Sequence, residues 1–308
     1  MTFNFKLSSP YYRLDSLSKA RDINFWVKRD DMIPHFMGGN KVRKNKAIFK
    51  GFSSEIDVIL TNGGAESNHA RVCALMAAQL GLKCHLVLHG SPEKSAFLNG
   101  NSFFIEASGA HVAYAEPKDI ASIIESLRTE YVRQGLNVAV VPGGGHSIEG
   151  AKSYMDAVEE LPEEPDYIFL ASGTGATHAG IQAGIVAQGW KTKVIGISIA
   201  RLNPIGKEAV EEVYYPLIQQ ELSLTKEQCP EIEFIDNYVY GGYSKYSQSL
   251  VARIKKEVCR TGLPLDPVYS GKAFIGMLDY LKEHKVQNDS KIVFWHTGGL
   301  LNLQSSKV

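Results

Sequence analysis

Lys41 is the first residue that suggests chemistry, because it follows a flexible Gly-Gly-Asn segment, residues 38–40, and stands among further cations. Arg43, Lys44 and Lys46 lie within the next five residues. Nearby like charges lower the pKa of a lysine, since they disfavour another ammonium group. A lysine with a lowered pKa is an amine nucleophile near neutral pH. A solvated basic helix start is the alternative, and this segment alone leaves both interpretations open.

A second chemical feature is the segment ASGTGATHAG, residues 171–180, which follows a strongly apolar run. Its glycines let backbone amides approach an anion, and its threonines add hydroxyl donors. It is not a P-loop, because Gly180 is followed by Ile-Gln rather than by Lys and Ser or Thr. It is a poor dinucleotide fingerprint, because His178 stands where the third Gly or Ala belongs. A phosphate on a smaller cofactor fits better.

Three more segments place polar residues at glycine-rich turns after apolar runs. They are NGGAESNHA (62–70), LDPVYSGKA (265–273) and FWHTGG (294–299). In the first, Ser67 or Asn68 can cap a helix whose exposed amides suit a carboxylate, although simple helix capping is the alternative. In the other two, we expect Tyr269, Ser270, His296 and Thr297 to reach one shared cleft. Tyr269 also fits the role of a half-buried aromatic residue.

These features together describe a cofactor that carries both an aldehyde and a phosphate. Pyridoxal phosphate has both groups, with a lysine as partner of the aldehyde and a ring that accepts electrons. The sequence contains no HExxH, HxxEH or Asp-rich metal pattern and no Gly-x-Ser-x-Gly motif. We therefore expect pyridoxal 5'-phosphate as the cofactor, and no metal.

Alternating apolar runs and helical stretches from residue 57 onward must position these residues. The predicted strands cover 57–62, 83–89, 110–115, 136–142, 166–172, 193–200, 265–269 and 291–295. The predicted helices cover 67–80, 96–108, 117–134, 147–160, 176–188, 204–221, 244–260 and 271–284. Near-continuous Val, Ile and Leu strands between helices are typical of parallel sheets covered on both faces. The sequence predicts an α/β fold of two lobes that meet near residues 145–165.

Charge and composition restrict the partners of the protein. The chain has 33 Lys and Arg against 33 Asp and Glu, so no net field favours nucleic acid or an anionic membrane. No uncharged apolar run approaches the roughly 18 residues that span a bilayer, and the first twenty residues lack the apolar core of a signal peptide. The four cysteines are widely scattered, which indicates reduced thiols. We expect a soluble cytoplasmic protein without nucleic-acid or membrane partners.

Six motifs, in this order along nearly the whole chain, resemble one known family. They are VKRDD (27–31), GGNKVRK (38–44), NGGAESNHAR (62–71), GTGATHAG (173–180), LDPVYSGKA (265–273) and HTGG (296–299). The sequence resembles the D-cysteine desulfhydrase and 1-aminocyclopropane-1-carboxylate deaminase family, which has the tryptophan-synthase-β-like fold of pyridoxal phosphate enzymes. This resemblance implies two open, twisted, mostly parallel sheets with helices on both faces. It also implies a large cofactor-binding domain (1–44 with 150–308), a smaller domain (45–149) and a homodimer.

The resemblance also assigns roles to individual residues. Lys41 is expected to form the Schiff base and to move protons at the substrate Cα, and Asn68 to bind the phenolic oxygen of the cofactor. The expected catalytic residues are Lys41, Ser67, Tyr243 and Tyr269. The expected cofactor-binding residues are Lys41, Asn68, Gly173, Thr174, Gly175, Ala176, Thr177, Ser270 and Thr297. The expected substrate-binding residues are Glu66, Ser67, Asn68, His69 and His146.

Two positions distinguish the branches of this family. Deaminases that open the cyclopropane ring resemble Tyr-Glu where this chain has Tyr269-Ser270, and they carry Leu at the position of Thr297. A carboxylate keeps the ring nitrogen of the cofactor protonated and strengthens the electron sink, whereas a hydroxyl group does not. The milder sink favours β-elimination. Glu66 and His146 depart from the family pattern, which resembles Gln at the first position and Gly-Ser-Asn around the second.

The sequence therefore predicts a pyridoxal-phosphate-dependent lyase for a small amino-acid substrate. We expect α,β-elimination and deamination of the D-cysteine desulfhydrase type, giving a 2-oxo acid and ammonia. One alternative keeps the cofactor but performs β-replacement, or γ-elimination or substitution, on a related amino acid in specialised metabolism. Another is a cofactor-binding protein without turnover.

Overall fold

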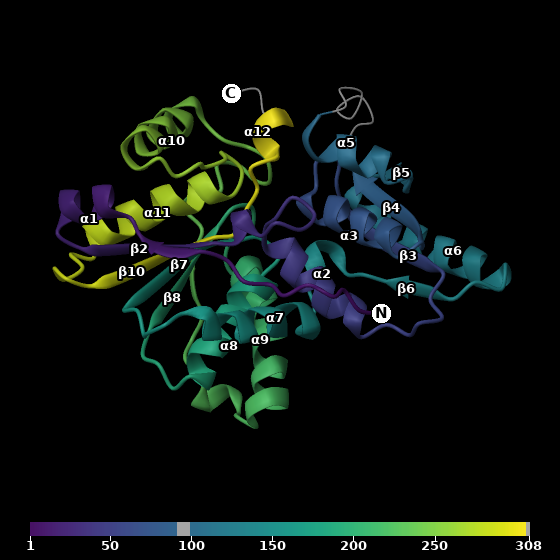
Figure 1. Ribbon diagram of the computed structural model, residues 1–308, viewed down its shortest axis with the longest axis horizontal. Helices are drawn as coiled ribbons and strands as arrows, with labels where there is room; N and C mark the ends of the chain where they lie inside the picture. Colours follow the sequence, from purple (N-terminus) through teal and green to yellow (C-terminus); the bar gives the residue numbers. More distant parts are fainter. Residues whose placement is uncertain (91–98, 306–308) are drawn as a thin grey trace.

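The computed structural model describes residues 1–90 and 99–305, which form two separate sheets with helices around them (Figure 1). The larger sheet has six strands in the order β1-β2-β10-β7-β8-β9. β1 is antiparallel to β2, and every other neighbouring pair is parallel. These strands are β1 (Tyr11–Arg13), β2 (Asn24–Arg29), β7 (Tyr167–Ser172), β8 (Lys193–Ser198), β9 (Glu233–Ile235) and β10 (Lys291–His296).

The smaller sheet has four parallel strands in the order β5-β4-β3-β6. They are β3 (Val58–Gly64), β4 (Lys83–His89), β5 (His111–Ala115) and β6 (Val138–Val140). All four lie within residues 45–149, the range predicted for the smaller domain. The domain boundaries themselves stay a prediction.

Helices cover both faces of the larger sheet because its central strands are apolar on both sides. In β7, Ile168 and Leu170 pack into one core, whereas Phe169 and Ala171 pack into another. One face carries α1 (Asp15–Arg21), α10 (Gln248–Thr261) and α11 (Ser270–Glu283). The other carries α7 (Ile148–Ala157), α8 (Ala176–Ala187) and α9 (Ile205–Leu222). Burial on both faces explains the unbroken apolar runs of the sequence.

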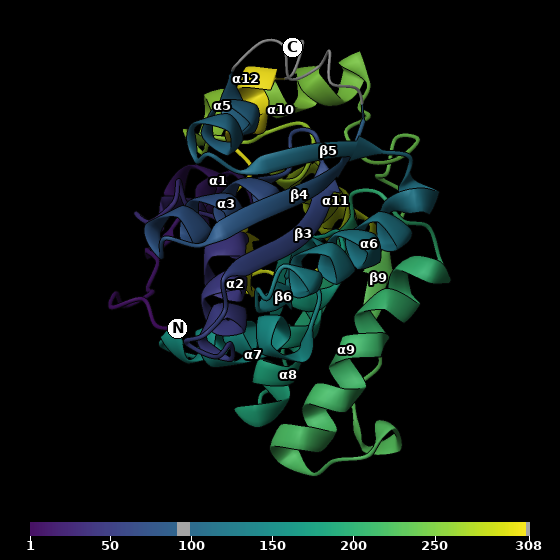
Figure 2. The same ribbon diagram turned by 90° about the vertical axis from the view of Figure 1, so that its right-hand side faces the viewer.

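The smaller sheet is also covered on two sides. Ile59 of β3 packs with Val72 and Met76 of α3 (Asn68–Gln79), and α5 (Gly100–Ala107) joins the same core. α6 (Ile120–Arg133) contacts β3, β4 and β6, and Figure 2 shows it across these strands from α3. α2 (Asn40–Lys50) lies between the two sheets and contacts α3 and α7. Lys41 thus lies in the first turn of the helix between the two sheets.

The structure confirms the predicted fold class, with two mostly parallel sheets and helices on both faces. The predicted strand 265–269 is wrong, because the Asp266 carboxylate accepts the backbone N–H groups of Val268 and Tyr269 and folds this segment into a turn. Strands β1, β2 and β9 were not predicted. Part of predicted helix 96–108 lies outside the described residues, and α5 begins at Gly100. Within the described residues, no helix has the length and apolarity to cross a membrane.

Candidate active site

The carboxyl ends of the central strands meet the start of α2 around one narrow cavity. Residues from the Gly-Gly-Asn turn, from the β7–α8 loop and from the segment after β10 line it together. The turn needs glycine, because a Cβ at Gly38 would lie 2.5 Å from the Asp31 carbonyl oxygen and one at Gly39 would lie 3.2 Å from that of Thr297. The backbone N–H of Asn40 donates to the Thr297 carbonyl at 2.8 Å. The turn therefore docks Lys41 directly against the end of β10.

Lys41 is partly buried, and its amine donates to the Gly144 carbonyl at 3.3 Å. Burial lowers its pKa to about 8, although its hydrogen bond with Lys44 acts in the opposite direction. Lys44 donates to the same carbonyl at 2.5 Å, and burial together with the charge of Lys41 holds its pKa well below the usual value. The expected lowering of the Lys41 pKa is present, but desolvation is its main cause.

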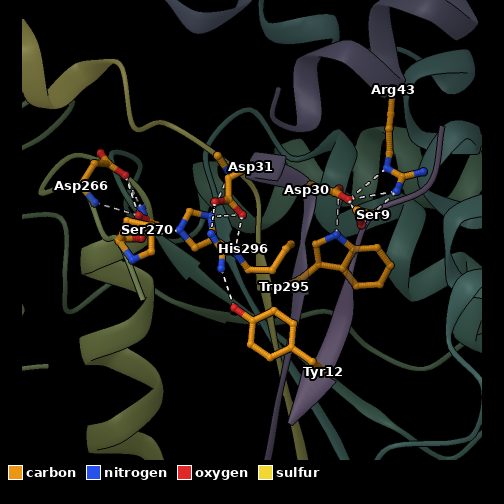
Figure 3. Close-up of polar contacts among 12 residues, drawn as sticks. Ser9, Tyr12, Asp30, Asp31, Arg43, Asp266, Ser270, Trp295 and His296 are labelled. Atoms are coloured by element: carbon orange, nitrogen blue, oxygen red, sulfur yellow. Dashed lines mark hydrogen bonds and ion pairs between the residues drawn. The ribbon is translucent and has the colours of Figure 1, made fainter. Parts of the chain in front are cut away.

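The other two cations of the segment do not crowd Lys41. Arg43 forms ion pairs with Asp30 at 3.0 Å and with Glu160 at 2.5 Å, so its charge is balanced on both sides. Figure 3 shows Asp30 between Arg43 and Trp295. Lys46 points to the Phe5 carbonyl and the face of the Phe5 ring. Arg43 therefore fixes the orientation of α2 rather than tuning the lysine.

The β7–α8 loop has the features of an anion site. α8 begins at Ala176 without a side-chain cap, so its first-turn amides remain available for a ligand. Gly175 has φ +107°, and a Cβ there would lie 2.7 Å from the Ala209 carbonyl oxygen. The Asn40 side-chain amide donates to the Thr177 hydroxyl at 3.0 Å, which leaves the hydroxyl proton of Thr177 free to donate. Gly173 and Thr174 line the cavity beside them.

The charge around this cavity is one-sided. Lys41, Lys44 and Arg71 line it, and no Asp or Glu does among the described residues. Burial lowers the pKa of Arg71 to about 10, and its guanidinium donates to the carbonyls of Met37 and Gly38. Basic side chains without acidic neighbours, together with a row of free amides, suit a doubly charged phosphate.

A second cavity, of about 360 Å³, adjoins the first and opens beside the amine of Lys41. Ser67 and His69 line it from the end of β3, and Tyr243 and Tyr269 line it from the other half of the protein. Lys41, Gly173, Thr174 and Tyr269 line both cavities. The structure thus brings the four predicted catalytic residues to one place.

Ser67 caps α3, and its hydroxyl proton remains available for a further hydrogen bond. Its Oγ accepts the backbone N–H groups of His69 and Ala70, both at 3.2 Å. Both interactions use lone pairs of the hydroxyl, so its O–H can donate to a molecule in the second cavity. Ser67 therefore offers a hydrogen-bond donor next to Lys41.

His69 is a buried neutral acceptor. Thr61 donates its hydroxyl proton to the Val141 carbonyl at 2.7 Å, so the contact of 2.9 Å between Thr61 Oγ1 and His69 Nε2 requires the proton on Nε2. Burial and the charges of Lys41 and Lys44 hold the His69 pKa well below its usual value. With its ring N–H committed to Thr61, the side chain of His69 presents an acceptor, which differs from the donor expected for a substrate carboxylate.

Asn68 belongs to a buried cluster of side-chain amides. Its Oδ1 accepts from Asn101 at 3.1 Å, and its Nδ2 donates to Asn302 at 2.7 Å. Asn101 and Asn302 both donate to the Glu66 carbonyl at 3.1 Å. The Asn68 side chain also forms a hydrogen bond with Tyr269, and Asn68 lines the first cavity. The cluster fixes the orientation of the Asn68 side chain at the wall of the first cavity.

The hydroxyl groups of Tyr243 and Tyr269 are 2.6 Å apart. Burial is the main cause that raises the pKa of both phenols, and for Tyr269 the charge of Tyr243 adds to it. Both therefore keep their protons near neutral pH. One proton holds the pair together, and the other is available to a bound molecule.

The two hydroxyls expected at the ring nitrogen are not equivalent. Ser270 donates its proton to Asp266 Oδ1 at 2.7 Å and accepts the Asp266 backbone N–H at 2.9 Å (Figure 3). It does not line the first cavity, whereas Thr297 does. Ser270 thus secures the turn before α11, and Thr297 is the hydroxyl left for the ring.

The two residues that depart from the family pattern lie outside both cavities. The Glu66 carboxylate points toward α5, where Oε2 lies 3.4 Å from the position of a Cβ at Gly100. His146 follows Gly145, and its Nε2 lies 3.5 Å from the Glu212 carboxylate. Burial is the main cause that lowers the His146 pKa. Neither residue faces the second cavity directly.

A family model described as pyridoxal-phosphate dependent enzyme matches residues 4–298. The chain belongs to this family. It is 31% identical to a D-cysteine desulfhydrase of Serratia proteamaculans, over 95% of this chain and 91% of the relative. It is 33% identical to a putative 1-aminocyclopropane-1-carboxylate deaminase of Pyrococcus furiosus, over 95% and 89%. A crystal structure of an ACC deaminase homologue matches with a TM-score of 0.86, 30% identity and coverage of 98% and 93%.

These similarities confirm the predicted family, the fold class and the cofactor: the protein is a pyridoxal-phosphate-dependent enzyme. The first cavity fits this cofactor, because its amides, its hydroxyls and its cations suit a phosphate and the amine of Lys41 stands at its edge. Thr297 lines the same cavity and offers a hydroxyl to the ring.

Two basic residues that line the first cavity, Lys44 and Arg71, were not predicted as site residues. Lys44 lies one helical turn after Lys41, so a spacing of three residues places both on the same face of α2. Arg71 follows Asn68 at the same spacing on α3. In both helices, the residue one turn after the expected site residue lies on the same face and lines the same cavity.

Proposed function

We propose that this pyridoxal-phosphate-dependent enzyme is a lyase. It removes the Cα proton of a small amino acid, eliminates a leaving group from Cβ and releases a 2-oxo acid and ammonia. One observation carries this proposal: the Lys41 amine, the Ser67 hydroxyl and the paired phenols of Tyr243 and Tyr269 line a single cavity beside the cofactor site. Elimination needs one base and one proton donor, and this cavity supplies both.

Lys41 is the proposed base. With a pKa lowered to about 8, a sizeable fraction of its amine is neutral near neutral pH. A neutral amine would hold the cofactor through its aldehyde, and Lys41 would accept the proton from the substrate Cα. Bound pyridoxal phosphate supplies the electron-accepting ring that stabilises negative charge at Cα. The Gly144 carbonyl accepts a hydrogen bond from the Lys41 amine at 3.3 Å. This contact positions the amine between the first cavity and the second cavity.

The groups opposite Lys41 serve the carboxylate and the leaving group. The Ser67 hydroxyl and the amides at the start of α3 are the proposed donors to the substrate carboxylate. The free proton of the Tyr243–Tyr269 pair is the proposed donor to the departing group. Because the pKa values of both phenols are raised, the phenols stay protonated until a basic leaving group develops.

The first cavity holds the cofactor in this proposal. The amides of residues 174–177, the Thr177 hydroxyl and the Lys44 amine bind the phosphate, and Asn68 donates to the phenolic oxygen. Thr297, which lines this cavity, would offer its hydroxyl to the ring nitrogen. Because Thr297 carries no negative charge, it does not hold a proton on that nitrogen, which supports elimination rather than ring opening.

Elimination is preferred over replacement of the leaving group. The similar proteins carry the names D-cysteine desulfhydrase and 1-aminocyclopropane-1-carboxylate deaminase, and both names denote cleavage. We further propose a homodimer in the cytoplasm, which rests on the resemblance to the family. Sedimentation equilibrium of the purified holoenzyme tests the dimer, and a monomer at micromolar concentration refutes it.

The test of the function uses purified protein with pyridoxal phosphate. Wild-type enzyme is incubated with each enantiomer of cysteine and of β-chloroalanine, and 2-oxo acid and ammonia are measured. We expect both products in equal amounts from one enantiomer, and none from Lys41→Ala. If an added thiol or amine is incorporated instead of 2-oxo acid being released, the enzyme is a β-replacement enzyme. If no amino acid changes the cofactor spectrum, the proposal fails.

A further inference from the structure

Arg201 is a cation in the second cavity that the elimination mechanism does not use. It follows β8, and its backbone is held in place by the fully buried Ser198. The Ser198 hydroxyl donates to the Arg201 carbonyl at 2.6 Å and accepts the Arg201 backbone N–H at 3.1 Å. The next turn is anchored as well, because the N–H of Asn203 donates to Asp236 at 2.7 Å. The backbone of Arg201 is therefore held in a fixed position at the wall of the second cavity.

The guanidinium group of Arg201 has no carboxylate partner within residues 1–90 and 99–305. The ion pairs found in this part of the chain do not include it, and it is half-buried. The charge of Arg201 reaches His146, where burial is the main cause that lowers the pKa and the arginine charge adds to it. A half-buried cation without a counterion attracts an anion more strongly than a fully solvated cation does.

The second cavity has cations but no described acidic residue on its wall. Lys41 and Arg201 are its basic residues, and the remaining polar lining comes from Asn62, Ser67, Thr174 and the tyrosine and histidine side chains. Lys41 is committed to the cofactor and to the Cα proton. The start of α3, at Ser67, is the proposed site of the substrate α-carboxylate. Arg201 thus provides a second anion-binding position in the same cavity, on the side that β8 forms.

We infer that the substrate of this enzyme carries a second anionic group on its side chain, and that Arg201 binds it. This inference rests on the proposed function, and it narrows the substrate class to amino acids with a carboxylate, sulfonate, sulfate or phosphate beyond Cβ or on it. Arginine suits such groups because its planar guanidinium donates two parallel hydrogen bonds to an oxyanion. Arg201 does not line the cofactor cavity, so the cofactor phosphate has its own partners.

The chemistry balances when the anionic group is also the leaving group. The Cα–H bond breaks and its proton goes to Lys41, while the bond from Cβ to oxygen or sulfur breaks with its electron pair on the departing oxyanion. Lys41 then returns the proton to Cβ, and water replaces the nitrogen, which gives the 2-oxo acid and ammonium. Arg201 stabilises the negative charge that leaves, so it acts as a specificity-determining residue for this reaction.

Equilibrium binding separates this role from turnover. Aspartate has a second carboxylate and no β leaving group, and alanine is the same molecule without that carboxylate. Each enantiomer is titrated into the holoenzyme, with the cofactor absorption spectrum and calorimetry as readouts. We compare wild type with Arg201→Gln, with Arg201→Lys and with Arg128→Gln, a control on the exposed surface of α6.

We expect wild type to bind one enantiomer of aspartate at least tenfold more tightly than alanine. Arg201→Gln loses this preference, Arg201→Lys keeps part of it and Arg128→Gln keeps all of it; hydrogen bonds to charged groups correspond to a loss of about tenfold to hundredfold. In turnover, we expect phosphoserine or cysteate to show a higher KM in Arg201→Gln, and serine and cysteine to show an unchanged KM.

Two outcomes overturn the inference. The first is equal binding of aspartate and alanine by wild type. The second is a loss of cofactor affinity in Arg201→Gln, since Arg201 would then belong to the phosphate site. The proposed function fails separately: if aspartate binding depends on Arg201 but no amino acid is eliminated, the anion site stands without the lyase. If cysteine is eliminated and Arg201→Gln changes nothing, the lyase stands without the anion site.

Discussion

Replacing Asp30 by asparagine tests the network that orients α2 and therefore Lys41. Asp30 is fully buried, and its carboxylate accepts hydrogen bonds from Ser9 at 2.7 Å, from Arg43 at 3.0 Å, from Tyr154 at 2.5 Å and from Trp295 at 2.9 Å. Four donor groups converge on two oxygens. An asparagine replaces one of these oxygens with an NH₂ group, which then faces donors.

We expect Asp30→Asn to lower the free energy of unfolding by about 3 kcal/mol, the lower end of the cost of breaking a buried ion pair. The lower end applies because Arg43 keeps its contact with Glu160. Tyr154→Phe removes a single hydrogen bond to the same carboxylate, which is expected to cost about 2 kcal/mol. Because both changes act on one network, the double variant loses less than the sum of the single losses.

The pH dependence of this loss follows from the Asp30 pKa. Burial raises that pKa, but the charge of Arg43 and the hydrogen bonds of Arg43, Tyr154 and Trp295 outweigh burial and hold it below its usual value. The carboxylate therefore stabilises the fold above the unfolded-state pKa of about 3.9, and this contribution disappears as the pH falls through the folded-state value. The difference between wild type and Asp30→Asn is expected to be constant from pH 5 to pH 8 and to shrink below about pH 4.

Urea unfolding of the apo protein, followed by circular dichroism at several pH values, measures these losses. The reasoning is refuted if Asp30→Asn is within about 0.5 kcal/mol of wild type at pH 7, or if Tyr154→Phe is the more damaging change. A difference that grows as the pH falls contradicts the sign of the pKa shift.

Three further results are expected at the site. Addition of pyridoxal phosphate to apo protein is expected to accelerate with pH through about 8, where Lys41 becomes neutral, and a rate independent of pH between 7 and 9 contradicts the lowered pKa. Tyr269→Phe leaves Tyr243 without its partner at 2.6 Å, and stopped-flow assays are expected to show kcat reduced about hundredfold with little change in cofactor binding. Ser270→Ala is expected to lower the free energy of unfolding by about 1 to 2 kcal/mol without a shift of the cofactor absorption band. Thr297→Val is expected to shift this band. The opposite pattern would show that Ser270, rather than Thr297, contacts the ring nitrogen.

Much of the fold could be predicted, because buried parallel strands are apolar throughout. The strand ending at Ser172 and the helix beginning at Ala176 were predicted within a residue of their observed bounds. β2 was missed because Lys28 and Arg29 end it, and these charges are buried only because Glu160 and Asp31 pair with them. The Lys28–Glu160 pair joins residues far apart in the sequence, which local patterns do not reveal.

The site was predictable to a different degree. Lys41 and the glycine loop around Gly175 follow from local chemistry, since each needs a particular residue type in a particular turn. The cause of the Lys41 pKa shift could not be predicted from the sequence. The sequence shows the charges of Arg43 and Lys46, but it does not show that Arg43 pairs with Asp30 or that Lys46 donates to the Phe5 carbonyl. Ser270 shows the same limit, since its partner Asp266 is four residues away but the direction of its proton depends on the fold.

The central claim is that Lys41 moves the Cα proton of an amino acid within this site. Exchange of that proton in deuterated water, followed by NMR on a panel of D- and L-amino acids, tests the claim before any product forms. We predict that holoenzyme exchanges the α-proton of at least one enantiomer, and that Lys41→Ala reconstituted with cofactor does not, while Arg128→Gln exchanges normally. Exchange that persists at the wild-type rate in Lys41→Ala would contradict the account, because another group would then be the base.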